Sequence, residues 1–268
     1  MSMRLPPLLR CLVVVPLCGP AAAQTAPRGM YCEALAAEDV IASVSSHGEF
    51  RLASGRTIKL ADVRLPLEAD DFGRALAWLQ SLAGRPVLVA APAGGADRWN
   101  RIPAAVAILD DTSPIDLADL LVDEGFAIVD AGDRPGLCRP ELLGREERAR
   151  AGRRGLWAGE RHRPVRADDL ERLQGLVGHF TLVEGVVRSI GERRERTYLN
   201  FGPDWTSDLT VVVPKRTWAG MRERGLSAAT LKGRRVRARG VLDGWQGVAM
   251  EIAAADMLEL LGQEPSRR

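Results

Sequence analysis

The chain has 268 residues, and its 37 lysines and arginines nearly balance its 35 aspartates and glutamates, for a formal net charge of +2. This length is enough for one large domain or two small ones. The near balance of charge excludes a global basic field that would by itself indicate nucleic-acid binding, and the excess of basic residues toward the C-terminus is small.

Residues 1–24 have the pattern of a secretory signal peptide. Arg4 and Arg10 form a short basic region, residues 12–17 are apolar, and the small residues 21–23 precede Gln24. This pattern predicts cleavage near residue 23 or 24, and it places the mature protein in the periplasm or outside the cell. The apolar run is shorter than the roughly 20 residues that span a bilayer, and no later segment is apolar enough, so no stable membrane span is expected. An anchored form is the alternative.

Residues 30–160 are predicted to form a first domain built on a small barrel. Apolar alternation indicates strands, the segment from Ala53 to Gly55 supplies a turn, and the spacing of Ala75, Leu79 and Leu82 indicates a helix. The predicted strands are 40–44, 49–52, 57–63, 87–90, 103–110 and 127–129, and the predicted helices are 67–83, 115–124 and 141–154. This order of elements fits a five-stranded barrel of the OB type.

A second β-rich domain is predicted over residues 179–263, after a linker with a short helix at 161–178 and before a tail at 264–268. Its predicted strands are 180–190, 196–201, 209–213, 234–241 and 247–252, with a helix at 215–223. Strands, a helix and strands again suggest a second OB-like barrel. The predicted fold class is therefore mainly β with α (α+β), with two small barrels.

Two cysteines remain after the signal, Cys32 and Cys138. In an oxidising compartment an isolated pair is most simply a disulfide. No histidine is near either cysteine in the sequence, so nothing indicates an activated thiol.

Four motifs of the first domain, in chain order, are similar to those of the staphylococcal nuclease (thermonuclease) family. They are GRTIKLADVRLP at 55–66, DRWNR at 97–101, LVDEGFA at 121–127, and the helix that runs from EERAR at 146–150 to GLW at 155–157. Residues 40–157 therefore resemble a thermonuclease-family domain, which implies an OB-type barrel with three helices. Residues 180–261 are more loosely similar to small bacterial OB-like domains found beside nuclease domains.

The resemblance implies a phosphodiester hydrolase that needs calcium. In this family, carboxylates bind Ca²⁺, a glutamate activates water, and two arginines neutralise the phosphate. Arg101 matches the second arginine, and Lys59 matches the first but lacks its planar fork. Both are candidate phosphate contacts.

The carboxylate positions of the family are not kept. Arg64 matches a calcium-binding aspartate, Leu67 matches the glutamate, and Gly48 falls where the earlier calcium aspartate is expected. Glu68, one residue later than the matched glutamate, is a displaced candidate base. We therefore expect no metal at this site and little activity by the family mechanism, although other carboxylates could in principle rebuild a site.

Candidate nucleic-acid contacts combine aromatic and basic side chains, because single strands bind by base stacking over a basic groove. The candidates are Arg98, Trp99, Trp205, Trp245, Arg237 and Arg239. Structural roles are the alternative: residues 97–101 could form only a hydrogen-bonded corner, and most aromatic residues of a small barrel belong to its core.

Three functions remain open. The first is an exported thermonuclease-like protein with a degenerate site that binds single-stranded nucleic acid or another polyanion. The second is an active nuclease with a relocated metal site, which alone would need Ca²⁺; otherwise no cofactor is expected. The third is an envelope structural module whose partner is an envelope protein. Fold alone does not decide between them.

Overall fold

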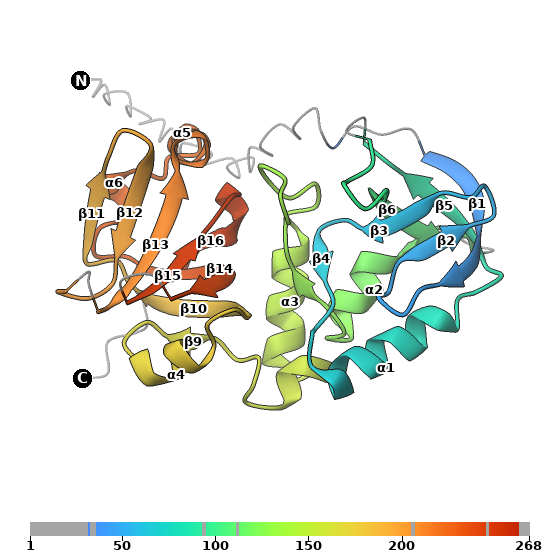
Figure 1. The fold of residues 1–268 in the computed structure, drawn as a ribbon, viewed down its shortest axis with the longest axis horizontal. Coiled ribbons are helices and arrows are strands. Elements are labelled where there is room, and N and C mark those ends of the chain that lie inside the picture. Colours follow the sequence, from blue (N-terminus) through green and yellow to red (C-terminus); the bar gives the residue numbers. More distant parts are fainter. Residues whose placement is uncertain are drawn as a thin grey trace, which may run out of the picture.

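The computed structural model describes residue 32 and residues 36–92, 95–110, 113–204, 207–244 and 247–262. Two β-rich units lie side by side, with helix α3 (Leu142–Ala151) between their sheets (Figure 1). We call residues 36–158 the N-terminal unit and residues 165–260 the C-terminal unit. Within the described residues, no helix is long and apolar enough to cross a membrane.

The N-terminal unit contains a closed five-stranded barrel. Its strands are β1 (Ala36–Val44), β2 (Phe50–Leu52), β3 (Thr57–Leu60), β5 (Pro86–Ala90) and β6 (Ile102–Ile108). They pair in the order β3-β2-β1-β5-β6, and a parallel pairing of β3 with β6 closes the ring. Alternate residues point inward, so that Ile41, Phe50 and Ile58 are fully buried. The predicted OB-type barrel and the mixed α+β class are confirmed.

Three helices flank this barrel, as predicted. They are α1 (Ala69–Gln80), α2 (Leu117–Asp123) and α3, followed by the 3-10 helix η2 (Gly155–Ala158). Helix α2 begins at Asp116 because this side chain accepts hydrogen bonds from the amides of Ala118 and Asp119. The short strand β7 (Ile115–Asp116) extends the sheet beside β6.

The predicted strand 57–63 is interrupted at Asp62. This residue has a φ of +64°, a conformation that a non-glycine residue rarely adopts. Its carboxylate is 3% exposed, forms an ion pair with Arg134, and accepts the amides of Cys138 and Arg139 at 3.2 and 2.8 Å. These bonds hold the turn, which ends β3 at Leu60 and starts β4 (Val63–Arg64) in a new direction, paired with β8 (Ile128–Val129).

The C-terminal unit is an eight-stranded sheet with short helices. Its strands are β9 (Val165–Arg166), β10 (Phe180–Val186), β11 (Ser189–Glu192), β12 (Arg196–Asn200), β13 (Leu209–Pro214), β14 (Arg235–Asp243), β15 (Val248–Glu251) and β16 (Leu258–Leu260). Its helices are α4 (Leu170–Gly175), α5 (Lys215–Glu223), α6 (Ala228–Leu231) and the 3-10 helix η3 (Ala255–Met257). The order is β11-β12-β13-β15-β14-β10-β9, with β16 beside β14. The pairings between described strands do not show a second closed barrel.

Two details of this unit differ from the sequence prediction. The predicted strand 180–190 is divided into β10 and β11, because Val187 exchanges backbone hydrogen bonds with Gly233 and Arg234 while Arg188 turns to Asn200. The elements β9, α6, η3 and β16 were not predicted.

Buried ion pairs join the two units. Arg239 on β14 and Glu146 on α3 are both fully buried, and their Nη1 and Oε2 atoms are 2.6 Å apart. Beside them, Arg237 contacts Glu147 of α3 at 2.8 Å and Glu184 of β10 at 2.6 Å. Helix α3 is therefore packed against the second sheet through one ion pair excluded from water, Arg239–Glu146, and a second, Arg237–Glu147, whose glutamate is about half exposed.

The disulfide predicted between Cys32 and Cys138 is present, with a Cα–Cα distance of 5.2 Å. It joins the segment before β1 to the loop before α3, across a sequence separation of 106 residues. The Asp62 carboxylate holds the same loop through the amide of Cys138.

Candidate functional site

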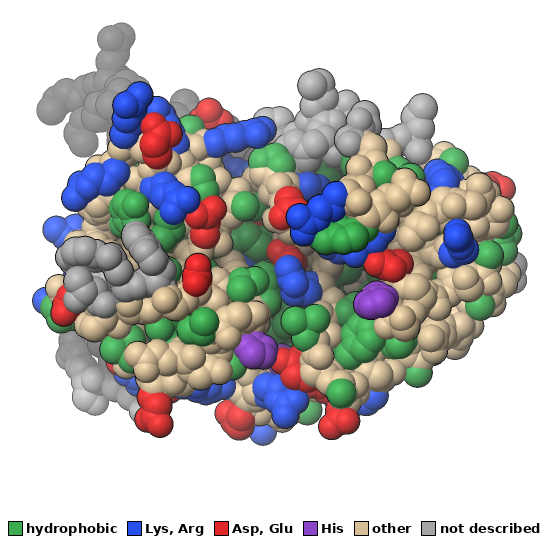
Figure 2. All heavy atoms as spheres, in the orientation of Figure 1, with side chains coloured by type: hydrophobic (Ala, Val, Ile, Leu, Met, Phe, Trp, Pro, Cys, Tyr) green, Lys and Arg blue, Asp and Glu red, His purple; other side chains and the backbone are tan. Residues whose placement is uncertain are grey.

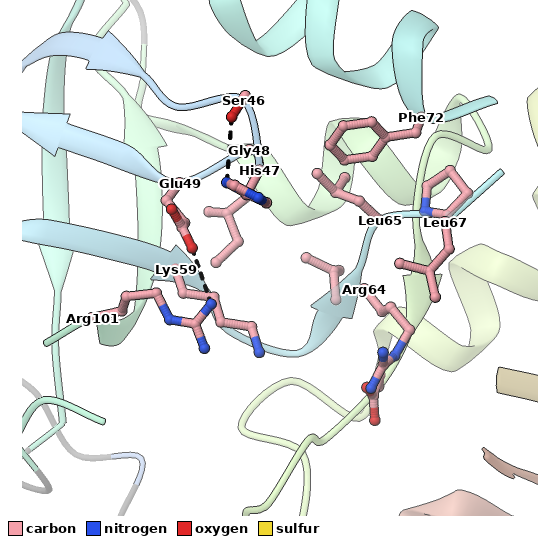
Figure 3. Close-up of a pocket in the computed structure, with 14 residues that line it drawn as sticks. Ser46, His47, Gly48, Glu49, Lys59, Arg64, Leu65, Leu67, Phe72 and Arg101 are labelled. Carbon is pink, nitrogen blue, oxygen red and sulfur yellow. Dashed lines mark hydrogen bonds and ion pairs between the residues drawn. The ribbon is translucent and has the colours of Figure 1, made fainter. Parts of the chain in front are cut away.

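A pocket of about 370 Å³ opens at one rim of the N-terminal barrel. It lies between the turn after β1, strand β3, the segment that follows β4, and the residue that precedes β6 (Figure 3). The five positions to which the thermonuclease resemblance assigns chemistry all line it, namely Gly48, Lys59, Arg64, Leu67 and Arg101. The structure thus brings together residues that are up to 53 positions apart in the sequence.

Arg101 is held rigidly by two carboxylates. Its Nη1 is 3.0 Å from Glu49 Oε1, and its Nη2 is 2.7 Å from Asp97 Oδ2. The other oxygen of Asp97 accepts the amides of Trp99 and Arg101 at 2.9 and 3.0 Å, which closes the corner 97–101. The side chain is therefore fixed in place, and because each terminal nitrogen already contacts a carboxylate, a phosphate would have to share these donors.

The pKa values of this corner follow from the same contacts. The Arg101 hydrogen bond, against an opposing effect of burial, lowers the pKa of Asp97 to about 2. Burial acts to raise the pKa of Glu49, but hydrogen bonds from Arg101 and Ser45 lower it overall. The pKa of Arg101 is raised, chiefly by Asp97. All three groups are consequently charged at neutral pH.

Trp99 presents an exposed indole beside this corner. The side chain is 58% exposed. The guanidinium carbons of Arg98 and Arg101 lie 3.8 and 4.5 Å from the centroid of its ring. Cation–π contacts of this kind orient the ring while leaving apolar surface in water. The arrangement can stack a base next to positive charge.

Lys59 is the cation of the pocket that has no anionic partner among the described residues. It is exposed on β3, and its side chain extends into the same region of the pocket as that of Arg101 (Figure 3). An exposed ammonium without a carboxylate partner keeps its full charge available for an anion.

Arg64 is turned toward a different partner. Its Nε is 2.8 Å from Asp130 Oδ2, and its guanidinium lies 4.8 Å from the centroid of the Phe180 ring of the C-terminal unit. Figure 3 shows the side chain directed away from Lys59 and Arg101. The position that the resemblance gives to a calcium ligand therefore holds a paired cation.

A carboxylate side chain at position 48 would have to displace Leu65. The φ of Gly48 is +82°, and a Cβ added there would lie 2.4 Å from Cδ1 of Leu65. Leu65 thus fills the space in which an aspartate would project. The two carboxylates that line the pocket, those of Glu49 and Asp130, are each paired with an arginine. The residues present do not fit the calcium ion of the family.

Glu68 does not line this pocket. It precedes α1, where its Oε2 is 3.8 Å from Nε2 of His162, and Asp71 Oδ2 is 3.0 Å from the same nitrogen. These contacts fasten the segment around His162 to the start of α1. The structure therefore does not bring the displaced candidate base together with Arg101.

The prediction that Arg237 and Arg239 contact nucleic acid is wrong, because both side chains are buried. Arg237 and Arg239 are 6% and 1% exposed, and each is paired with carboxylates between the units. They are not available to a nucleic acid, because leaving their partners would strand buried charge. Trp205 and Trp245 lie outside the described residues. Arg98 and Trp99 are exposed and do not line the pocket, but the Trp99 ring lies against Arg101, which does.

Sequence reasoning missed two residues that shape the pocket. Asp130 follows the short strand β8, and Leu65 follows β4. Asp130 lies outside the four motifs, and Leu65 lies inside the motif at 55–66 but is not one of its polar positions; only the tertiary contacts with Arg64 and Gly48 show what they do. No local signal in the sequence could have identified them.

Comparisons with known proteins add little to this geometry. No family model matches the chain, and no curated protein matches it. Among solved structures, the chain is similar to the extended Tudor domain of Tudor-SN from Drosophila melanogaster, with 22% sequence identity and a TM-score of 0.32. The similarity covers 38% of this chain and 47% of that chain, less than half of its length.

Proposed function

We propose that the chain is an exported, thermonuclease-like protein that binds single-stranded nucleic acid, or another polyanion, without cutting it efficiently. The observation that carries this proposal is the pocket itself. It gathers the five positions of the family's chemistry, yet its metal-ligand positions are Gly48, crowded by Leu65, and Arg64, paired with Asp130. A divalent ion would gain a ligand at neither position, because Gly48 has no side chain and Arg64 is a cation that is already paired with Asp130.

Binding is supported by what the pocket keeps. Lys59 is unpaired within the described residues, Arg101 is fixed in place, and the exposed ring of Trp99 lies beside it. Phosphate contacts supply affinity and register, and an aromatic platform accepts any base. A single strand suits this arrangement better than a duplex, since stacking on Trp99 requires a base with a free face.

The experiment is cleavage of a fluorophore-quencher single-stranded DNA by the oxidised protein, with calcium or with chelator, beside an Arg101→Ala control. We expect no cutting under either condition. Calcium-dependent cutting that disappears in Arg101→Ala would mean that other carboxylates rebuild a metal site, and the proposal of a degenerate enzyme would be wrong.

Binding is measured by fluorescence anisotropy of a labelled oligothymidylate. We expect Trp99→Ala to weaken binding by about 1 to 3 kcal/mol, the contribution of one stacked base. Val177→Ala, which truncates an exposed apolar residue of the C-terminal unit, is the matched control and should leave affinity unchanged. Affinity that is insensitive to salt, or absent, would instead favour a module that recognises an envelope protein.

A further inference from the structure

The positive charge of the chain is concentrated away from the pocket. The N-terminal unit, residues 36–158, holds 15 lysines and arginines against 19 aspartates and glutamates, a net charge of −4, and the C-terminal unit, residues 165–260, holds 15 against 13, a net charge of +2. Within the C-terminal unit, residues 188–235 hold 11 against 5, a net charge of +6. The whole chain has only +2, so this asymmetry is hidden in its overall balance. A polyanion drawn to the protein would be steered toward the C-terminal unit.

Most cations of this segment are exposed and free of carboxylate partners. Within the described residues, seven of them are exposed and form no ion pair, namely Arg188, Arg193, Lys215, Arg216, Arg222, Lys232 and Arg234. Figure 2 shows lysine and arginine side chains gathered over β11, β12 and α5, at the upper left. We call these seven residues the basic surface.

Backbone contacts place the cations of the basic surface around the β11–β12 hairpin. At its base, the amide of Val187 donates to the carbonyl of Arg234 at 3.0 Å, which brings the α6–β14 turn next to Arg188. At its tip, the amide of Lys215 donates to the carbonyl of Glu195 at 2.9 Å, which brings α5 next to Arg193. Four residues of extended chain lie between Arg188 and Arg193, which places their backbones about 17 Å apart along the hairpin.

The composition of this surface favours a water-soluble polyanion over a lipid bilayer. Proteins that bind the membrane interface insert large apolar residues among their cations. None of the exposed large apolar residues of the described chain lies within residues 188–235; the nearest is a single valine at the edge of the surface, Val186, which pairs in register with Arg235. A surface of cations without such residues matches a phosphate backbone, whose charges all face water.

We infer that the basic surface of the C-terminal unit docks the phosphate backbone of a single-stranded nucleic acid, as a second contact beyond the pocket of the N-terminal unit. This inference rests on the proposed function for the identity of the polyanion. The N-terminal unit then supplies base stacking at Trp99, and the C-terminal unit supplies most of the electrostatic attraction. The strand is held at two places on one chain, so binding at one raises the effective concentration at the other.

The test uses the full chain with four neutral substitutions on the basic surface, Arg188→Gln, Arg193→Gln, Lys215→Gln and Arg234→Gln. The matched control removes four exposed, unpaired cations of the N-terminal unit, Arg51→Gln, Arg85→Gln, Arg148→Gln and Arg153→Gln. Both variants lose the same net charge. Thermal unfolding of each is measured first, and substitutions at exposed, unpaired positions are expected to leave it within a few degrees of the wild type.

Affinity for labelled oligothymidylate is then measured between about 50 and 200 mM salt. Each phosphate contact to a single strand contributes about 0.7 to the slope of log K against log salt, so the basic-surface variant should lose about 3 from the slope and the control much less. Equal losses in the two variants would overturn the inference, since net charge alone would then explain binding. So would wild-type binding to anionic vesicles but not to the oligonucleotide.

The same measurements separate this inference from the proposed function. If Trp99→Ala leaves affinity unchanged while the basic-surface variant loses its slope, the pocket is not an interface; the proposed function then fails at the pocket, while docking of the phosphate backbone on the basic surface is supported as the single contact. If Trp99→Ala weakens binding while the basic-surface variant keeps the wild-type slope, the pocket is the interface and the inference fails.

Discussion

Replacing Arg239 with methionine should destabilise the whole molecule. The side chains of Arg239 and Glu146 are both 0% exposed, and their Nη1 and Oε2 atoms are 2.6 Å apart. Removing one partner of a buried ion pair costs about 3 to 5 kcal/mol, because the remaining charge stays out of water. Glu146 keeps Arg150 at 3.2 Å and the amide of Val129 at 2.9 Å, so the cost should fall near the lower end, about 3 kcal/mol.

The assay is urea denaturation followed by circular dichroism, supported by thermal unfolding. A loss of about 3 kcal/mol in a chain of this size lowers Tm by roughly 6 to 12 °C. The control is Arg196→Met, whose ion pair with Glu251 is about half exposed at 3.5 Å and should contribute less than about 1 kcal/mol.

A double-mutant cycle completes this test. Adding Glu146→Gln to Arg239→Met removes the fully buried charge that the single variant leaves without Arg239; the other partner of Arg239, Glu259, is 19% exposed and keeps a contact with Arg237 at 3.8 Å. The double variant should therefore be less destabilised than the sum of the two single variants, by about 1.5 kcal/mol or more. A single variant that costs less than about 1 kcal/mol, or a double variant equal to the sum, would refute the reasoning that these charges are buried and coupled.

Three further predictions concern the pocket and the disulfide. Gly48→Ala should cost about 2 to 4 kcal/mol, because φ is positive and the added Cβ would lie 2.4 Å from Leu65. Gly55→Ala is the control: its φ is similar but the space around it is open, so it should cost only about 1 kcal/mol, and equal losses of Tm in the two variants would contradict the crowding at Gly48. Asp97→Asn should lower the free energy of unfolding by an amount that is constant above about pH 4 and shrinks as the pH falls toward 2. The reason is that the pKa of Asp97 is lowered from 3.8 to about 2, so the carboxylate loses its contribution to stability between these pH values; a difference in Tm that does not change with pH would contradict this prediction. Reducing the disulfide, which closes a separation of 106 residues, should cost about 4 kcal/mol, and unchanged denaturation with reductant would refute this.

The barrel could be predicted because its strands carry their own signals. Inward and outward residues alternate along β6, and Gly55, with a φ of +86°, supplies the turn between β2 and β3. The break at Asp62 could not be predicted, because it depends on amides that are more than seventy residues away. The elements α6 and β16 have only four and three residues, too few for a periodic pattern.

Part of the candidate site could likewise be predicted from the sequence, and part could not. The corner around Arg101 is local in sequence, so its spacing identified it, and the position of Lys59 followed from the motif on β3. Arg237 and Arg239 alternate with apolar residues, a pattern typical of a half-exposed strand. Only the structure shows that α3 covers this strand with Glu146 and buries both arginines.

The wall of the pocket is also a point of contact between the units. Arg64 pairs with Asp130 inside the N-terminal unit while its guanidinium lies over the Phe180 ring at the start of β10. A ligand phosphate that drew Arg64 away from Asp130 would also remove the cation from that ring. Occupancy of the pocket would then be coupled thermodynamically to the packing of the C-terminal unit, and ligands at the two units would influence each other's affinity by equal factors.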